Sequence, residues 1–110
     1  MAAAYIPPQE APSRDEIDRS QGLVLLEFGT NWCGICRALQ PQVAALLQRN
    51  PDVRHIKVED GPGQPLGRSF RVKLWPNLVF LRDGIPVRQL ARPSAAELKE
   101  AFAELTAARP

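Results

Sequence analysis

Apolar residues follow two different periods along the chain, and these periods predict strands and helices in alternation. The segment 23–28 is a continuous apolar run broken by one acid, which is typical of a strand buried on both faces. Three more segments have the length and composition of strands: 53–59, 78–81 and 87–90. Between the last two, the dipeptide Asp83-Gly84 is typical of a hairpin turn.

Helical spacing of apolar residues predicts helices over 13 to about 22, 33–49, 66–70 and from residue 94 onward. The first and the last of these open with a capping box, in which Ser13 or Ser94 is followed three residues later by a glutamate. The second carries Leu39, Val43 and Leu46 on one face, which indicates that this face is buried.

The predicted elements alternate along the chain in the order helix, strand, helix, strand, helix, strand, strand, helix. Strands separated by helices favour parallel pairs with right-handed crossovers, and the final hairpin adds an antiparallel edge. The fold class is therefore α/β, a single domain over 13–110 in which helices cover both faces of a mixed sheet of four to five strands. Residues 1–12 are rich in alanine and proline and show no period, so we expect a flexible N-terminal tail.

Composition narrows the class of protein further. The chain has 110 residues, of which 45% are apolar and 24% charged, so it is long enough for one hydrophobic core and unlike a wholly disordered protein. No apolar run approaches the ~18 residues that span a bilayer, so we expect no membrane segment. The net charge of +2 comes without a block of like charges, which gives nucleic-acid binding no support. The N-terminus lacks the pattern of a secretory signal peptide and the content of Ala, Arg and Pro is high, so we expect a cytoplasmic, bacterial protein.

The candidate chemistry lies at the two cysteines, Cys33 and Cys36, which follow the buried strand and open the longest predicted helix. Two cysteines are too few for a disulfide framework, and in the cytoplasm such a pair is more often redox-active or metal-bound. At this spacing they lie about one helical turn apart, so their sulfur atoms can meet. The helix N-terminus favours the thiolate at Cys33 and is expected to lower its pKa. We therefore expect Cys33 to be the exposed attacking thiolate and Cys36 the buried resolving thiol.

The same pair is also compatible with half of a zinc site. Zinc takes four ligands, or three with a water molecule, and His55 is the only further imidazole or thiolate ligand in the chain. A site made from this chain alone would need carboxylates, and a site shared across a dimer stays open. The position of the pair between a buried strand and a helix favours the redox interpretation.

Several segments, in the same order along the chain, resemble the thioredoxin family. Segments 25–28 and 31–37 resemble the family's strand and active-site helix, and Pro41 lies where that helix carries its kink proline. The segment 72–80 resembles the one that contains the family's cis-proline, and residues 83–84 resemble its hairpin turn. The resemblance covers residues 13 to about 108. It implies the thioredoxin fold, a three-layer αβα sandwich, with thiol–disulfide exchange at the WCGIC motif of residues 32–36.

The resemblance implies that Pro76 is the cis-proline that packs beside the active-site disulfide. A cis bond there exposes the backbone of the preceding residue, Trp75, to pair with an extended substrate segment. From the sequence alone, an ordinary trans proline at the start of a strand is the alternative. Trp75 replaces a smaller aliphatic residue that is common at this position in the family, and it either enlarges or occludes the groove.

Glu27 is the lone carboxylate inside the apolar strand, and burial is expected to raise its pKa. The family usually has an aspartate here that shuttles the proton of the buried cysteine, so the resemblance implies that Glu27 serves Cys36 in this way. The alternative is a glutamate at a strand end that reaches solvent. His55 falls near the position of a family lysine that faces this acid. It either pairs with Glu27 or is a partly exposed strand histidine, and the sequence favours the latter.

Around the cysteines, six residues are expected to contact substrate: Trp32, Gly34, Ile35, Trp75, Pro76 and Ala91. Besides Trp75, two of them depart from the family's pattern. Ile35 replaces the common proline between the cysteines, and Ala91 occupies a rim position that is often glycine. The loss of a proline that favours the helix start indicates a shifted, less reducing potential.

The sequence therefore predicts a thiol–disulfide oxidoreductase that reduces protein disulfides through Cys33 and Cys36, with a mixed disulfide as intermediate. It needs no bound cofactor or metal beyond this dithiol, and it takes electrons from a thioredoxin reductase or another dithiol protein. A monomer is the family default. An alternative is a binding or chaperone-like module or a redox switch, in which Trp32, Ile35 and Trp75 form an apolar docking patch. An isomerase or oxidase role depends on the reduction potential, which the sequence leaves open.

Overall fold

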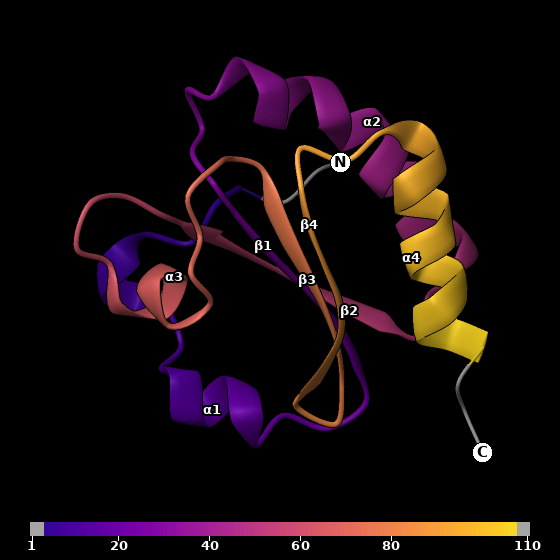
Figure 1. Cartoon of the computed structure of the whole chain (residues 1–110), viewed down its shortest axis with the longest axis horizontal. Coiled ribbons are helices and arrows are strands. Elements are labelled where there is room, and N and C mark those ends of the chain that lie inside the picture. The colour runs from indigo at the N-terminus through magenta and orange to yellow at the C-terminus, as the bar shows by residue number, and fades with distance from the viewer. Residues whose placement is uncertain (1–3, 108–110) are drawn as a thin grey trace.

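Four strands form one mixed sheet in the computed structural model, which describes residues 4–107 (Figure 1). In the order of the chain they are β1 (Leu23–Gly29), β2 (Val53–Glu59), β3 (Asn77–Arg82) and β4 (Ile85–Ala91). In the sheet their order is β2-β1-β3-β4. β1 pairs with β2 in parallel, whereas β3 pairs antiparallel with both β1 and β4. The predicted turn joins β3 to β4, with positive φ at both of its residues, Asp83 and Gly84.

The direction of β3 differs from the expectation that strands separated by helices run parallel. β2 ends at Glu59 beside the end of β1 at Gly29, and β3 begins at Asn77 beside Phe28, at the same end of the sheet. Since the connection over 60–76 stays at that end, β3 runs back along β1 in the opposite direction. The hydrophobic period identifies the strands but does not say to which end of the sheet a connection leads.

Helices cover both faces of this sheet (Figure 1). Their bounds are α1 Arg14–Asp18, α2 Gly34–Arg49, α3 Pro65–Ser69 and α4 Ala95–Ala107. One hydrophobic core joins α2 and α4 to the sheet, and a second core lies on the opposite face with α1 and α3. The result is the predicted three-layer αβα arrangement.

β1 contributes to both cores, because successive side chains of a strand point to opposite faces. Leu23 and Leu25 belong to the core beneath α2 and α4, while Val24 and Leu26 belong to the core beneath α1 and α3. This double burial explains why the strand is apolar throughout. By the same alternation Glu27 lies on the face that α2 covers, and it is fully buried.

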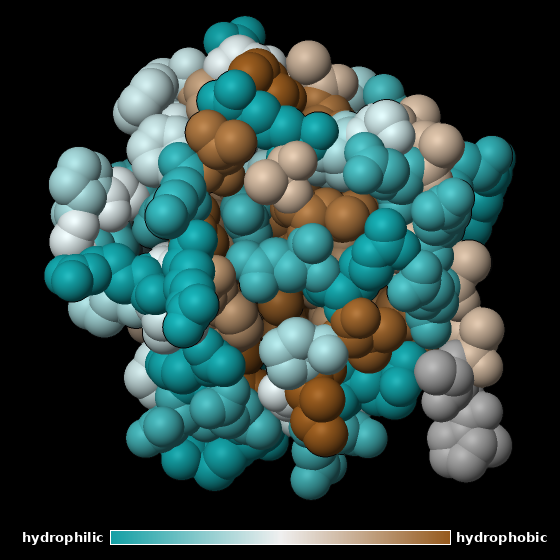
Figure 2. Space-filling view, in the orientation of Figure 1, coloured by the Kyte–Doolittle hydropathy of each residue, from teal (hydrophilic) through white to brown (hydrophobic). Residues whose placement is uncertain are grey.

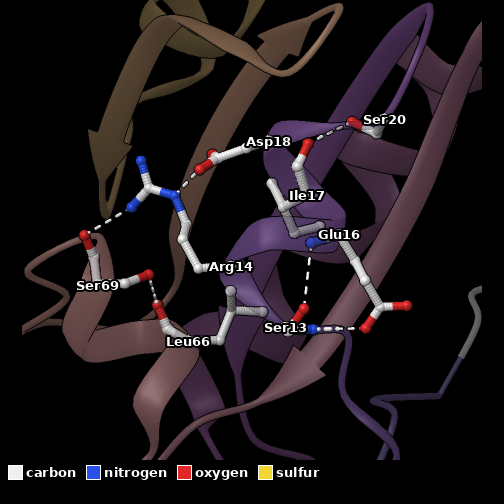
Figure 3. Close-up of polar contacts among 8 residues, drawn as sticks. All are labelled: Ser13, Arg14, Glu16, Ile17, Asp18, Ser20, Leu66 and Ser69. Carbon is white, nitrogen blue, oxygen red and sulfur yellow. Dashed lines mark hydrogen bonds and ion pairs between the residues drawn. The ribbon is translucent and has the colours of Figure 1, made fainter.

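Polar contacts at the start of α1 fix this short helix against α3 (Figure 3). The Ser13 hydroxyl accepts a hydrogen bond from the Glu16 amide at 3.1 Å, and the Ser13 amide donates to the Glu16 carboxylate at 2.9 Å. Arg14 donates to the Asp18 carboxylate and to the Ser69 carbonyl, both at 2.8 Å. The predicted capping box is therefore present, and Ser94 and Glu97 make the same contacts at the start of α4.

The N-terminal segment packs along the edge of β2, whereas we expected a flexible tail over 1–12. The Ile6 amide donates to the Lys57 carbonyl at 2.7 Å, and the Ile6 carbonyl accepts from the Glu59 amide at 2.9 Å. Pro8–Glu10 then form a 3-10 helix, η1. An edge strand has unpaired N–H and C=O groups that an extended segment can satisfy, which composition alone does not reveal. The first three residues of the expected tail lie outside the described part of the chain.

The face of the molecule shown in Figure 2 is mostly polar. In the space-filling view hydrophilic residues predominate and hydrophobic ones form separate patches (Figure 2). Among the large apolar residues between 4 and 107, Trp32 is the most exposed at 73%, and Ile35 is 46% exposed. Both flank the cysteines, so the chemistry predicted from the sequence lies beside exposed apolar surface.

Candidate active site

The two cysteines lie at the N-terminus of α2, directly after β1. Cys33 is the N-cap of the helix, and its Sγ accepts a hydrogen bond from the Cys36 amide at 3.2 Å. Both are present as thiols, with Cys33 partly exposed and Cys36 fully buried. The helix therefore presents one sulfur to solvent and holds the other one turn deeper, as the spacing predicted.

Beneath Cys36, the buried Glu27 carboxylate accepts hydrogen bonds from several elements of the fold. The Tyr5 hydroxyl and the Gln40 amide donate to Glu27 Oε2 at 2.9 and 2.8 Å. His55 Nε2 lies 2.8 Å from the other carboxylate oxygen, Oε1. Gln40 also donates to the Cys36 carbonyl at 3.2 Å, so the amide links the acid to the helix turn that carries the buried thiol. This arrangement excludes the alternative of a solvent-exposed strand-end glutamate.

The pKa of Glu27 is shifted in the direction opposite to our expectation. Burial raises this pKa, as the sequence argument assumed. The hydrogen bond and charge of His55, with the hydrogen bonds from Tyr5 and Gln40, outweigh burial, so the pKa of Glu27 is lowered. The prediction was wrong because it included the cost of burying the carboxylate but none of the partners that stabilise its charged form.

His55 pairs with Glu27, which the sequence had treated as the less favoured of two alternatives. In the parallel register Leu25 lies beside His55 and Glu27 beside Lys57, so both basic residues point to the face that holds the acid. Lys57 is buried and donates to the Gln40 side chain at 3.1 Å. Burial lowers the pKa of Lys57, and the negative charge of Glu27 opposes this shift. The register between β1 and β2 brings His55 to the acid, and the hydrophobic period of the sequence does not encode this register.

Cys36 is a weak acid in this environment. Burial raises its pKa, as does its contact with Cys33, to about 11. Hydrogen bonds from the Thr30 backbone and the Tyr5 side chain act in the opposite direction. At neutral pH this thiol is therefore protonated, and it must lose a proton before it can act as a nucleophile.

Aromatic residues form one side of the site. The rings of Trp32 and Trp75 meet edge to face, with centroids 5.7 Å apart. Trp75 is half-buried, and its indole Nε1 donates to Asp60 Oδ2 at 2.9 Å. This hydrogen bond fixes the large side chain beside the cysteines. The peptide bond between Trp75 and Pro76 is cis.

On the other side, a small groove of about 160 Å³ runs between α2 and the end of β4. Ile35, Pro76 and Arg92 are among the residues that line it. Gly34 is exposed at the start of α2, whereas Ala91 is exposed in register with Asn77 and does not line this groove. Five of the six expected rim residues thus lie at the start of α2, in the aromatic pair or along the groove, whereas Ala91 is not among the residues that line the groove.

The backbone carbonyl of Trp75, expected to be open to substrate, is already engaged. Arg92 Nε donates to it at 2.8 Å, and the Arg92 amide donates to the Pro76 carbonyl at 2.9 Å. An extended substrate that pairs with this carbonyl must therefore displace the Arg92 side chain or share the acceptor with it.

Neither a metal centre nor a membrane span is found in the described part of the chain. Within residues 4–107 no three His, Cys, Asp or Glu side chains are grouped so that they could hold a metal ion. No helix over the same residues is both long and apolar enough to cross a bilayer.

Comparisons with a family model, with curated proteins and with solved structures all lead to the same family. The family model for thioredoxin matches residues 8–104. The chain belongs to the thioredoxin family. Among solved structures, reduced thioredoxin 2 of Pseudomonas aeruginosa PAO1 is 57% identical, with a TM-score of 0.83 and 96% of each chain covered. Among curated proteins, thioredoxin Asp f 28 of Aspergillus fumigatus is 29% identical over 80% of this chain and 82% of its own length. Thioredoxin H2 of Arabidopsis thaliana is 26% identical over 84% and 70%.

These findings establish the fold and the class of activity. The chain has the thioredoxin fold and is a thiol–disulfide oxidoreductase acting on protein disulfides. The thioredoxin relatives do not favour the alternative of a binding or chaperone-like module. The WCGIC segment, with its paired cysteines, lies where the fold places a partly exposed and a buried thiol one turn apart.

Sequence reasoning missed several residues of the site, among them Tyr5, Gln40 and Arg92. Tyr5 was assigned to the tail, although a lone tyrosine in an otherwise Ala- and Pro-rich segment is a signal of packing. Gln40 lies four residues after Cys36, on the same helix face, so its contact was accessible to a spacing argument. The contact of Arg92 with the Trp75 carbonyl has no signal in the sequence, because it depends on how the segment after β4 meets the segment before β3.

Proposed function

We propose that Cys33 is the attacking thiolate and Cys36 the resolving thiol of a protein-disulfide reductase. The observation that carries these roles is the difference in burial between two sulfurs at one helix start: Cys33 is partly exposed and Cys36 is fully buried. A bulky protein disulfide can approach the exposed sulfur only, so Cys33 must act first. Cys36 can attack only after the substrate is bound to Cys33, one helical turn away, because the two sulfurs are then held close together.

The exchange then has two steps. The Cys33 thiolate attacks one sulfur of the substrate disulfide, forms a mixed disulfide and releases the other substrate sulfur as a thiolate. The Cys36 thiolate attacks Cys33, so that the Cys33–Cys36 disulfide forms and the second substrate sulfur leaves as a thiolate. The substrate gains two electrons and the protein loses two. No cofactor beyond the dithiol takes part.

Glu27 is proposed as the base that receives the proton of Cys36 before the second step. It lies beneath the buried thiol and is linked to the same helix turn through Gln40. Because its pKa is lowered, it is ionised at neutral pH and ready to accept a proton. His55 supports the carboxylate from the β2 side.

The rim is proposed to hold substrate, with Trp32 and Ile35 as exposed apolar contacts and Pro76 in the groove floor. A methyl group added at Gly34 would meet no neighbouring side chain or segment within 4 Å, so this position leaves room for a substrate backbone. Trp75 closes one side, and Ala91 is a peripheral contact. Burial of such apolar groups, together with a few backbone hydrogen bonds, is typical of extended-peptide recognition.

Electrons are proposed to come from a thioredoxin reductase or another dithiol protein, with the chain acting as a cytoplasmic monomer in a bacterium. The 57% identity with a Pseudomonas aeruginosa thioredoxin supports the bacterial assignment. The reduction potential of the Cys33–Cys36 pair, read by tryptophan fluorescence against a glutathione or dithiothreitol series, separates this reductase role from an isomerase or oxidase role. A potential near about −270 mV supports the reductase, and one near about −120 to −180 mV overturns it.

Two single variants test the assignment of the cysteines. Cys36→Ser is expected to accumulate a mixed disulfide with a model protein substrate through Cys33, whereas Cys33→Ser forms no adduct. Both variants should lose catalytic disulfide reduction. Mass spectrometry of the adduct identifies the attacking sulfur, and an adduct at Cys36 in the Cys33→Ser variant would contradict the assignment.

A further inference from the structure

Tyr5 occupies an unusual place for a residue so near the N-terminus. Only 7% of the residue is exposed, and its hydroxyl donates to Glu27 Oε2 at 2.9 Å. The hydroxyl oxygen and Cys36 Sγ also lie next to each other, since a methyl group added at Gly29 would meet both of them, at 2.5 and 2.7 Å. A hydroxyl that donates its one proton to the carboxylate has lone pairs left to accept from the S–H group. Tyr5 therefore connects the resolving thiol to the acid beneath it.

Gly29 makes room for this contact. A methyl group at Gly29 would lie 2.5 Å from the Tyr5 hydroxyl oxygen and 2.7 Å from Cys36 Sγ. Both distances are well inside van der Waals contact, so a larger residue here would force the hydroxyl or the thiol out of place. The glycine at the end of β1 thus leaves a space that the hydroxyl and the thiol share.

The segment that carries Tyr5 is anchored on β2. Both backbone groups of Ile6 are hydrogen-bonded to that strand, at 2.7 and 2.9 Å. The Lys57 ammonium lies 4.3 Å from the centre of the Tyr5 ring. The ring is therefore held by backbone pairing beside it and by a cation over its face, in the same position relative to Glu27.

We propose that the Tyr5 hydroxyl relays the proton of the Cys36 thiol to the Glu27 carboxylate during the resolving step, an inference that rests on the roles proposed above for these two residues. The Cys36 S–H proton passes to the Tyr5 oxygen as the Tyr5 O–H proton passes to Glu27 Oε2. The Cys36 thiolate then attacks Cys33, and the substrate sulfur leaves as a thiolate. Tyr5 ends the step as it began, with one proton, and Glu27 holds the proton that Cys36 has lost.

The electrostatic surroundings suit this relay. Burial and the neighbouring Glu27 raise the pKa of Tyr5, so its hydroxyl stays protonated. It can therefore pass a proton on by accepting one as it donates another, but it does not act as a base by itself. Burial raises the pKa of Cys36 to about 11, so the thiol needs assistance at neutral pH. Besides these two groups, Glu27 is faced by His55 and Lys57 from β2 and by the neutral Gln40 from α2. Both basic groups favour the ionised carboxylate that must accept the proton.

The test is Tyr5→Phe, which keeps the ring and its packing and removes only the hydroxyl. The mixed disulfide of Cys33 with a small aromatic thiol is prepared, and its resolution by Cys36 is followed in stopped flow from pH 6 to 10. We expect resolution at pH 7 to slow by about tenfold or more, less than the loss of a complete acid–base group because a water molecule can enter the vacated space. As the pH rises toward 10, direct ionisation of the Cys36 thiol, whose pKa burial raises, replaces the relay and the difference should shrink. Gln9→Ala, an exposed change in the same segment, is the control and should resolve at the wild-type rate.

The direction of the effect separates a relay from a structural role. Loss of the Tyr5 hydrogen bond raises the pKa of Glu27, which alone makes this carboxylate a stronger base and would leave resolution unchanged or faster. Slowing that fades at high pH therefore supports the relay. A wild-type rate in Tyr5→Phe, or slowing that is equal at every pH, overturns it.

A second pair of variants keeps the result interpretable. Ile6→Pro removes the amide that anchors the segment while leaving the Tyr5 hydroxyl in the chain, and it should reproduce part of the slowing with the same pH profile. Glu27→Gln tests the proposed function itself. If Glu27→Gln slows resolution and Tyr5→Phe does not, the relay alone fails. If neither variant slows it, the role of Glu27 fails as well.

Discussion

The pair formed by His55 and Glu27 makes the sharpest prediction about stability. Glu27 is fully buried, the His55 side chain is 15% exposed, and Nε2 lies 2.8 Å from Oε1. His55→Leu removes this contact while nearly conserving volume. A hydrogen bond to a charged group contributes about 1.5–3 kcal/mol, and breaking a buried pair costs about 3–5 kcal/mol. Because Tyr5 and Gln40 still donate to Glu27, we expect a loss of about 2–3 kcal/mol at pH 7.

The loss should depend on pH with a definite sign. In the wild type the pKa of Glu27 is lowered in the folded state, from a reference of 4.5, so its contribution to stability is complete above that reference and is lost as the pH falls through the folded value. In the variant burial is opposed by fewer partners, and we expect the folded pKa of Glu27 to rise above its unfolded value. A raised pKa contributes stability only at low pH, and this contribution is lost as the pH rises through the folded value. The cost of His55→Leu should therefore be larger at pH 7 than at pH 5.

Urea unfolding at pH 5 and pH 7, followed by tryptophan fluorescence, measures both quantities. His55→Gln retains an N–H donor and should recover part of the loss, whereas Arg54→Ala, an exposed change on the same strand, should stay within about 0.5 kcal/mol of wild type. The reasoning is refuted if His55→Leu costs less than about 0.5 kcal/mol at pH 7 or costs the same at both pH values. It is also refuted if the glutamine variant is as unstable as the leucine variant.

Two further predictions concern the rim. Trp75→Phe removes the indole donor to Asp60. Because that donor is half-buried, we expect the free energy of unfolding in urea to fall by about 1–2 kcal/mol. An unchanged midpoint would show that this hydrogen bond does not hold the ring. Arg92→Ala frees the Trp75 carbonyl for substrate, so the KM for an extended peptide disulfide should fall by about 2- to 10-fold with kcat little changed. An unchanged or higher KM would show that substrate does not pair with this carbonyl.

Strands, capping boxes and the spacing of the cysteines were predictable because each depends on residues close together in the chain. β1 is apolar because both of its faces are covered, and such a run is recognisable without knowing what covers it. Ser13 and Glu16 cap α1 through contacts three residues apart. Cys33 and Cys36 differ in burial because one turn of helix separates them. In each case both interacting residues lie within a few positions of each other, so the local helix or strand geometry already sets the distance between them.

The partners of Glu27 were decided by tertiary structure, and with them the direction of its pKa. From the sequence, an acid inside an apolar strand is a buried acid, and burial alone raises its pKa. In the folded chain His55 reaches it through the parallel register of β2, and Tyr5 through a segment that pairs with the far edge of β2. These contacts lower the pKa of the same group. The sequence by itself determined the fold class and the place of the cysteine pair, and the fold decided how charge and protons are held around that pair, because electrostatic interactions depend on distances in space that separation along the chain does not fix.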